Sequence, residues 1–230
     1  MDFSPDGNTI ASGFSDGTVK LWNWNFDDSV KRGCNNLEGY LIEHPEKLEK
    51  VKVCQNKEIL TAVAYTWVKE GEFEAAVEKF KQAQQFDANV DLNPKTEELD
   101  NNPEVAAVMA LIIKGKEIVR DGKVKEAIAA YNKALKINPD LQISADDWDT
   151  LCWHGAINKH AQDVMDACEE AVNLEPENGS FKRSRGVARA LTGDTSGAIK
   201  DFEVYVDSFD DDNRWKSDVK GWIKDLRSGK

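Results

Sequence analysis

The chain has 230 residues, of which 40% are hydrophobic and 31% charged, a composition typical of a globular protein with a sizeable core. It carries 42 Asp and Glu residues against 30 Lys and Arg, a formal charge of -12, and this balance argues against a nucleic-acid partner because phosphate-binding surfaces are basic. The longest uninterrupted apolar run, 105–113, is about half of what a membrane-spanning helix requires. We therefore expect neither nucleic acid nor membrane as a partner.

The first seven residues lack the basic flank and the apolar stretch of a secretory signal, which predicts a cytoplasmic protein. Because the cytosol is reducing, its proteins rarely hold disulfides. We expect the four cysteines to be free thiols: Cys34, Cys54, Cys152 and Cys168.

Residues 3–24 alternate apolar and polar side chains, and Asp-Gly pairs at 6–7 and 16–17 interrupt the alternation. Alternation with period two indicates strands, and Asp-Gly between two such runs is a hairpin turn. The segment 1–26 is therefore predicted to form two or three antiparallel strands.

The same residues resemble one blade of a WD-repeat β-propeller. The resemblance rests on the stretch Phe3-Ser4-Pro5-Asp6-Gly7 and on Asp16-Gly17-Thr18-Val19-Lys20-Leu21-Trp22-Asn23, where Asn23 takes the place of the usual Asp. It covers about three strands of a four-stranded blade, and a propeller needs at least about four blades. The resemblance implies the end of a longer ancestor, or a truncated or split version of one.

From residue 27 onward apolar residues recur at helical spacing. Val30, Cys34, Leu37 and Leu41 form one stripe, which predicts linking helices over 27–56 with a break at Pro45. This stretch also resembles the helical tail that follows the last blade in bacterial, especially cyanobacterial, WD-repeat proteins.

A repeat follows in which Gly precedes Ala by five residues and Ala precedes an aromatic residue by four. Three units carry it, and a fourth has Ala and Pro in the same register, 34 residues before the last. The defining residues are Gly71, Ala76 and Phe80; Gly122, Ala127 and Tyr131; Ala171 and Pro176; and Gly193, Ala198 and Phe202. An insertion at about 88–103, rich in Asp, Asn, Pro and Glu, separates the first two units.

These units resemble the tetratricopeptide repeat, a pair of helices of about 34 residues. The resemblance covers roughly 57–210, and 211–230 reads as a capping helix after an acidic turn at Asp210-Asp211-Asp212. The expected fold is mainly α: a solenoid of about four helical hairpins plus a capping helix, preceded by a short antiparallel β segment.

Motifs that resemble catalytic or metal sites have structural explanations. The pentapeptide 13–17 matches the nucleophile elbow of α/β hydrolases, but it lies in a predicted hairpin and not before a helix. Cys152, His154, His160 and Cys168 could be zinc donors, yet both cysteines fall at core positions of the repeat. We expect no catalytic residue, no cofactor and no metal.

The first helix of each tetratricopeptide pair lines a concave groove, and the resemblance implies a set of groove-facing positions here. These are Tyr65, Lys69, Ile112, Lys116, Arg120, Asp149, Trp153, Arg183 and Val187. The Lys and Asn residues with which one subtype grips a C-terminal carboxylate are not assembled at these positions. Lys182, Arg183, Arg185 and Arg189 form a basic cluster that is either a solvated helix face or a site for an acidic segment.

Two functions follow from these observations. The first is a non-enzymatic scaffold that binds a protein segment, of unknown identity, in the groove. The second is an assembly or regulatory subunit. Its incomplete blade would leave apolar side chains and open strand edges, so that it would fold back on the helices, form homo-oligomers or complete a partner propeller.

Overall fold

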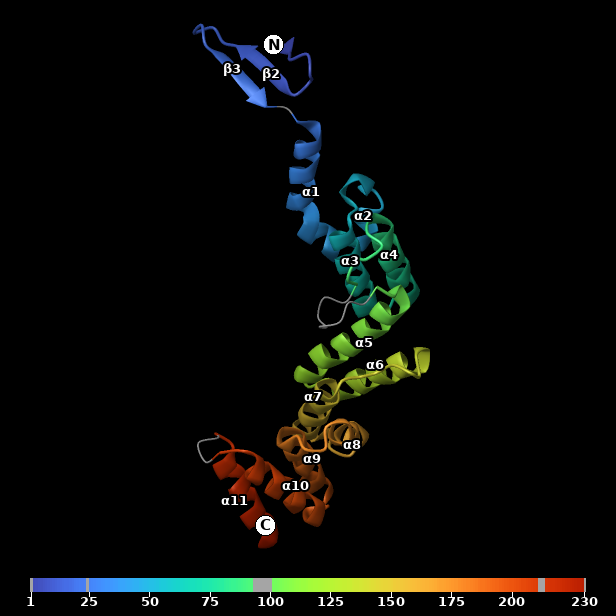
Figure 1. Cartoon of the computed structure of the whole chain (residues 1–230), viewed down its shortest axis with the longest axis vertical. Coiled ribbons are helices and arrows are strands. Elements are labelled where there is room, and N and C mark those ends of the chain that lie inside the picture. The colour runs from blue at the N-terminus through green and yellow to red at the C-terminus, as the bar shows by residue number, and fades with distance from the viewer. Residues whose placement is uncertain (1, 24, 93–100, 211–213, 230) are drawn as a thin grey trace. The chain divides into compact units, whose positions relative to one another are not determined.

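The computed structural model describes residues 2–23, 25–92, 101–210 and 214–229. Helices dominate it, after a short antiparallel sheet at the N-terminus (Figure 1). Residues outside these ranges include Trp24, the stretch 93–100 (half of the predicted insertion), and Asp211 and Asp212 of the predicted acidic turn. The chain divides into two compact units, Met1–Ala107 and Val108–Lys230.

The sheet of unit 1 contains strands β1 (Asp2–Phe3), β2 (Thr9–Gly13) and β3 (Val19–Asn23), in the order β1-β2-β3. Asp16 stabilises the second turn by accepting a hydrogen bond from the backbone N–H of Thr18, at 2.9 Å. Gly17 next to it has φ +81°, a conformation that glycine adopts without strain. The prediction of two or three antiparallel strands is confirmed, and the sheet has three.

The helices of unit 1 are α1 (Phe26–Glu43), α2 (Pro45–Leu48), the 3-10 turn η1 (Lys52–Cys54), α3 (Lys57–Glu70) and α4 (Phe73–Phe86). Asn56 begins α3, its side chain accepting a hydrogen bond from the backbone N–H of Ile59. Helices α3 and α4 form a hairpin whose core contains the fully buried Ala64 and Phe80.

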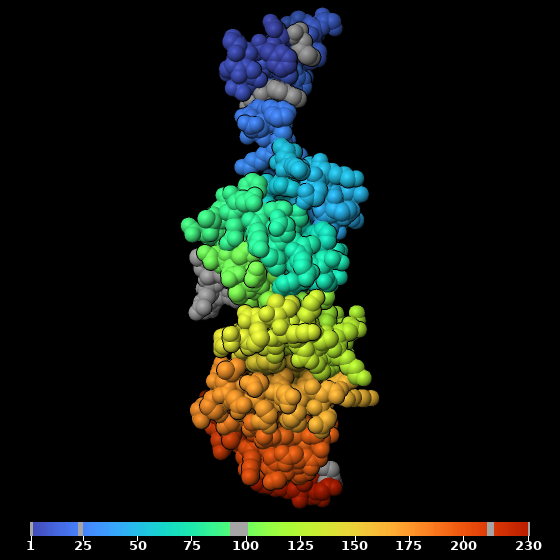
Figure 2. Space-filling view, turned by 90° about the vertical axis from the view of Figure 1, so that its right-hand side faces the viewer, coloured from blue at the N-terminus to red at the C-terminus, as the bar shows by residue number. Residues whose placement is uncertain are grey.

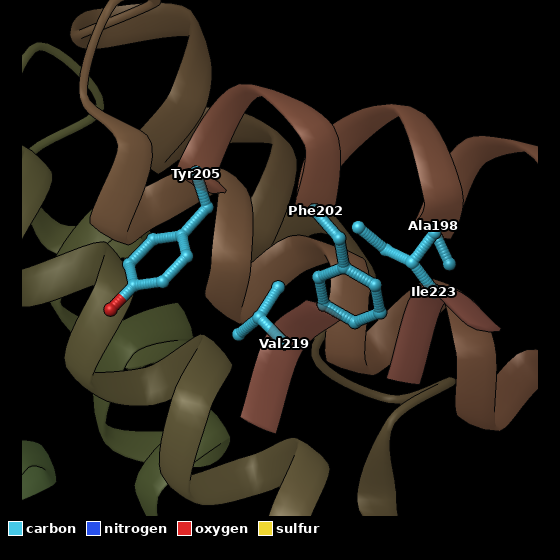
Figure 3. Close-up of a cluster of buried hydrophobic side chains, with 5 residues drawn as sticks. All are labelled: Ala198, Phe202, Tyr205, Val219 and Ile223. Atoms are coloured by element: carbon cyan, nitrogen blue, oxygen red, sulfur yellow. The ribbon is translucent and has the colours of Figure 1, made fainter. Parts of the chain in front are cut away.

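Unit 2 continues with helix pairs. It contains most of α5 (Pro103–Arg120), then α6 (Val124–Ile137), α7 (Ala145–Gly155), the π-helical segment η2 (Ala156–His160), α8 (Met165–Leu174), α9 (Gly179–Thr192), α10 (Thr195–Ser208) and α11 (Lys216–Arg227). Figure 2 shows these pairs as contiguous bands from yellow-green to red. The last pair packs against α11 through Ala198, Phe202, Tyr205, Val219 and Ile223, which agrees with the predicted role of a cap (Figure 3).

Each helix pair turns at a residue with positive φ, and these residues follow the register of the sequence repeat. The turns are at Gly71 (φ 97°), Gly122 (φ 80°), Lys159 (φ 70°) and Gly193 (φ 92°). Glycine is favoured at such helix ends because a Cβ is strained there. Among the described residues Lys159 is the single non-glycine with positive φ.

Inside the pairs, a small residue on the first helix faces a large one on the second. A Cβ placed on Gly115 would lie 2.6 Å from the Tyr131 ring, and one placed on Gly186 would lie 2.6 Å from the Phe202 ring. Ala64 and Phe80 hold the same positions in the first pair. Close approach of helices at small residues is thus the packing rule of this array.

The expectation of free thiols is wrong, because all four cysteines are in disulfides. Cys34 joins Cys54, which ties α1 to η1, and Cys152 joins Cys168, which ties α7 to α8. In the repeat register Cys152 and Cys168 hold the glycine and aromatic positions of the neighbouring pairs. A covalent bond therefore replaces the contact between a small residue and a ring, and it leaves no thiolate for a zinc site.

Candidate protein-binding groove

The guanidinium of Arg183 lies among three aromatic rings in unit 2. Its central carbon is 4.9 Å from the ring centre of Trp153, 5.2 Å from that of Tyr205 and 5.7 Å from that of Trp215. These rings come from α7, from α10 and from the residue just before α11. At such distances the ring faces attract the cation, which holds Arg183 in place without neutralising it.

Asp149 lies on α7 one turn before Trp153 and is partly buried. Burial raises the pKa of its carboxyl group to about 6, although the Ser184 hydroxyl and the charge of Arg183 both act to lower that pKa. The carboxylate oxygen Oδ1 is buried without a hydrogen-bond partner, and the Nε of Arg183 is in the same condition. Each such group costs about 1–3 kcal/mol until a partner satisfies it.

An apolar cavity of about 340 Å³ lies beside this polar pair. Trp153 contributes to both places, since it also lines the cavity together with Val187. The remaining lining residues are Ile157, Ala190, Leu191, Phe202, Trp222, Asp225 and Leu226. Unit 2 thus combines an apolar pocket with a few convergent polar groups, as binding sites commonly do.

The other two arginines of α9 that the sequence grouped with Arg183 have a different role. Arg185 pairs with Asp201 and Glu169 at 2.7 Å, and Arg189 pairs with the same two carboxylates at 2.9 and 2.7 Å. Asp201 is only 4% exposed. This network joins α8, α9 and α10, so Arg185 and Arg189 are structural and only Arg183 faces the aromatic group.

The structure brings four of the predicted groove residues together: Asp149, Trp153, Arg183 and Val187. Lys116 instead forms an ion pair with Asp147, whose backbone carbonyl accepts a hydrogen bond from the Tyr131 hydroxyl at 2.9 Å. Ile112 is fully buried, so it belongs to the core and its placement on the groove surface is corrected. Arg120 lies exposed at the end of α5.

The two predicted residues of unit 1 lie on α3. The Tyr65 hydroxyl donates a hydrogen bond to the backbone carbonyl of Leu92 at 3.0 Å, and its ring packs edge-on against Phe80. Tyr65 also lines a cavity of about 490 Å³ with Thr61, whose hydroxyl is buried and unpartnered. Lys69 is exposed near the end of the helix.

Sequence reasoning missed part of the site. Tyr205 lies on the second helix of its pair, where the repeat register predicts core packing and no groove residue. Trp215 and Trp222 lie in the predicted cap. The Trp215 ring also contacts the Arg183 guanidinium, and Trp222 also lines the apolar cavity. The signal for all three is the concentration of aromatic residues at the end of an otherwise charged segment.

The predicted sheet remains open. Pairing of Ile10 with Trp22 and of Ala11 with Leu21 places these pairs on opposite faces. Trp22 is 51% exposed and Leu21 is 71% exposed, so each face of the sheet carries an exposed apolar side chain. The pentapeptide 13–17 forms the turn between β2 and β3 and has no helix directly after it.

The chain resembles proteins of two repeat families. A family model described as "WD domain, G-beta repeat" matches residues 1–23. "DnaJ homolog subfamily C member 3" of Gallus gallus is 29% identical over 89 residues, 38% of this chain and 18% of that protein. The Homo sapiens protein of the same name is 22% identical over 102 residues, 44% of this chain and 20% of that protein. This chain therefore spans about a fifth of the length of these curated relatives.

Two solved structures are similar at low identity. The TPR domain of P58(IPK) has a TM-score of 0.46 and 16% identity, covering 83% of this chain and 53% of that one. YrrB, described as a TPR protein with an unusual peptide-binding site, has a TM-score of 0.47 and 15% identity, covering 80% and 82%. The tetratricopeptide-like fold of this chain itself rests on its repeated helix pairs and their equivalent turns. Over the described residues, no helix has the length and apolar character needed to cross a membrane.

Proposed function

We propose that this chain is a non-enzymatic scaffold that binds a protein segment in the groove of unit 2. The observation that carries the proposal is the Arg183 aromatic group beside the apolar cavity of about 340 Å³. Buried anchors flanked by arginine and tryptophan side chains are typical of protein-binding surfaces. Among the described residues no group of His, Cys, Asp and Glu side chains could hold a metal ion. The sequence prediction that nucleic acid is not a partner remains untested.

The test is affinity capture from the source cells with the full chain and two variants. Trp153→Ala removes the ring shared by the Arg183 group and the cavity, and we expect it to lose the captured partner. Lys200→Gln removes an exposed charge on α10 and should retain it. Retention by both variants, with unchanged helicity by circular dichroism, would place recognition elsewhere.

A second candidate function is assembly through the sheet. Phe3, Val19, Leu21 and Trp22 are between 51% and 71% exposed, and exposed apolar faces of this kind commonly mark interaction sites. In a propeller both faces of a blade pack against neighbouring blades, so further blades or a second copy would cover these side chains.

Sedimentation of the full chain tests this candidate. We expect self-association that Val19→Lys with Leu21→Lys abolishes, since both side chains share one exposed face and their replacement disturbs no core. A monomer at all concentrations would leave a partner propeller as the remaining form of the proposal. Failure to capture any WD-repeat protein would then contradict it.

The domain limits stay part of the proposal: a partial blade at 1–26, linking helices at 27–56, repeats at 57–210 and a cap at 211–230. The predicted cytoplasmic location is now opposed by the two disulfides, because disulfides persist mainly in oxidising compartments. Alkylation of the protein in intact source cells decides between a reducing and an oxidising compartment. Free thiols would be labelled before any reductant is added, whereas disulfide-bonded cysteines would not. A bacterial, especially cyanobacterial, origin stays an implication of resemblance.

A further inference from the structure

Two buried polar atoms of opposite hydrogen-bonding character lie in the same part of the groove. Asp149 Oδ1 can only accept a hydrogen bond while the carboxyl group is ionised, and Arg183 Nε can only donate one. Proteins rarely leave such groups unpaired. A chain segment whose peptide groups reached these buried atoms would satisfy both, since each peptide group carries one donor and one acceptor.

Arg183 also keeps its charge available. Over the described residues it forms no ion pair, while on the same helix Arg185 is held by two carboxylates and Arg189 by three. Its neighbours Trp153, Tyr205 and Trp215 restrict the guanidinium, and the Asp149 carboxylate lies near enough to interact with its charge without forming an ion pair. A guanidinium fixed in this way is preorganised for a carboxylate, which it can bind through two parallel hydrogen bonds.

The apolar cavity fixes the position of a second anchor. Because Trp153 borders both Arg183 and the cavity, the two subsites are about one indole ring apart. In an extended peptide, side chains of residues two apart point the same way and are separated by about 7 Å. One extended segment can therefore place an apolar side chain in the cavity and an acidic one on Arg183.

We propose that the groove of unit 2 recognises an extended, internal segment of a partner protein in which Asp or Glu lies two residues from a bulky apolar side chain. This inference rests on the proposed function and names the chemistry of the partner. The apolar side chain fills the cavity of Trp153, Val187 and Trp222, and the carboxylate binds Arg183. The Asp149 carboxylate accepts a hydrogen bond from a backbone N–H of the segment.

Other charges near the site limit the segment to one acidic residue there. Asp225 lines the cavity, and Asp146 lies close enough to raise the pKa of Asp149. Arg214 stacks on the Trp215 ring, 4.6 Å from its centre. A run of acidic residues would be repelled by Asp149 and Asp225, so a single acid is favoured over a polyacidic tract.

The probe is a capped heptapeptide, acetyl-Gly-Ser-Leu-Ser-Glu-Ser-Gly-amide, with matched peptides that carry Gln or Lys in place of Glu. Binding to the full chain is followed through the Nε–H resonance of Arg183, assigned with an Arg183→Lys variant. We expect a saturable shift with the Glu peptide and roughly tenfold weaker binding of the Gln peptide, because the charge-assisted pair is lost. The preference should shrink as salt is added.

Two variants connect the preference to Arg183. Arg183→Gln, followed through neighbouring backbone resonances, should bind the Glu and Gln peptides equally, with the leucine contribution intact. Lys200→Gln changes the net charge equally at an exposed position of α10 and should keep the roughly tenfold preference. Arg183→Lys retains the positive charge and should keep part of the preference for the Glu peptide. This result would separate a role in recognition from a loss of folding.

Each contrary result has a distinct meaning. Equal binding of the Glu and Gln peptides overturns acid recognition and leaves the groove proposal standing. Binding that requires a free terminal carboxylate in place of the amide overturns the internal segment. If no peptide shifts a groove resonance at about 5 mM, the inference fails. If, in addition, Trp153→Ala retains the captured partner, the proposed function fails with it.

Discussion

The α7–α8 and α9–α10 pairs occupy neighbouring places in unit 2 and differ at the two positions where their helices approach most closely. In α9–α10 a glycine, Gly186, admits the ring of Phe202. In α7–α8 the corresponding residues, Cys152 and Cys168, are joined covalently. The repeat therefore keeps a contact at these two positions although the side chains that form it differ, and four predictions examine this equivalence.

Removing the disulfide should have the largest effect. Cys152→Ala with Cys168→Ala frees a loop of 16 residues and is expected to lower the free energy of unfolding by about 3 kcal/mol. Cys152→Gly with Cys168→Phe copies the α9–α10 pair and should recover part of this loss. Chemical denaturation measures both. If the Gly and Phe variant is no more stable than the variant with two alanines, the equivalence is contradicted.

The contact between the two pairs should depend on pH through Asp149. Its pKa of about 6 lies above the ordinary value of 3.8 for an aspartate, so folding favours the protonated carboxyl group and stability falls as pH rises between these values. Asp149→Asn removes that cost, and its advantage over the wild type should grow by up to about 3 kcal/mol from pH 4 to pH 7. Denaturation midpoints across this range measure it, and a constant difference would contradict the prediction.

Adding a methyl group at Gly186, where α9 and α10 are in contact, should lower the free energy of unfolding by a somewhat smaller amount. In Gly186→Ala the new methyl would lie 2.6 Å from the Phe202 ring, and the resulting overpacking is expected to destabilise by about 2 kcal/mol. Gly221→Ala on α11 is the matched control, because nothing lies within 4 Å of a Cβ there. It should instead stabilise by about 0.5–1 kcal/mol. Thermal unfolding of both variants is the measurement.

The smallest effect is expected at the turn of α7–α8. Lys159 has φ 70° where the other pairs have glycine, and Lys159→Gly should relieve about 1 kcal/mol of backbone strain. Gly193→Lys at the equivalent turn of α9–α10 should cost a similar amount. Changes of opposite sign in the free energy of unfolding of the two variants would support the equivalence of the two turns. Changes of the same sign would contradict it.

The sequence register predicts the helix pairs well because it depends on local constraints. Turns at Gly71, Gly122 and Gly193 need glycine, and the spacing also locates the turn at Lys159. Ser144 begins α7 by a local interaction of the same kind, since its side chain accepts a hydrogen bond from the backbone N–H of Asp147. The sequence does not predict the disulfides, because the expected free thiols depend on the expected cytoplasmic location and not on the packing of the cysteines.

The groove was predicted only in part for a related reason. Repeat positions predict which helix faces the groove, and three of the residues chosen in this way, Asp149, Trp153 and Arg183, lie close together in the structure. They do not predict how far a long side chain reaches. Arg183 extends to Tyr205 on the second helix of its own pair, a contact that depends on tertiary packing.

The bond between Cys152 and Cys168 also has a mechanical consequence. Repeat arrays stretched from their ends unfold one unit after another, each adding its full contour length. Here the chain between Cys152 and Cys168, which are 16 positions apart, cannot extend under tension while the disulfide is intact. The α7–α8 pair would release about 55 Å less chain than its neighbours under the same force. A reductant would restore that missing length, so single-molecule extension would report the redox state of one helix pair.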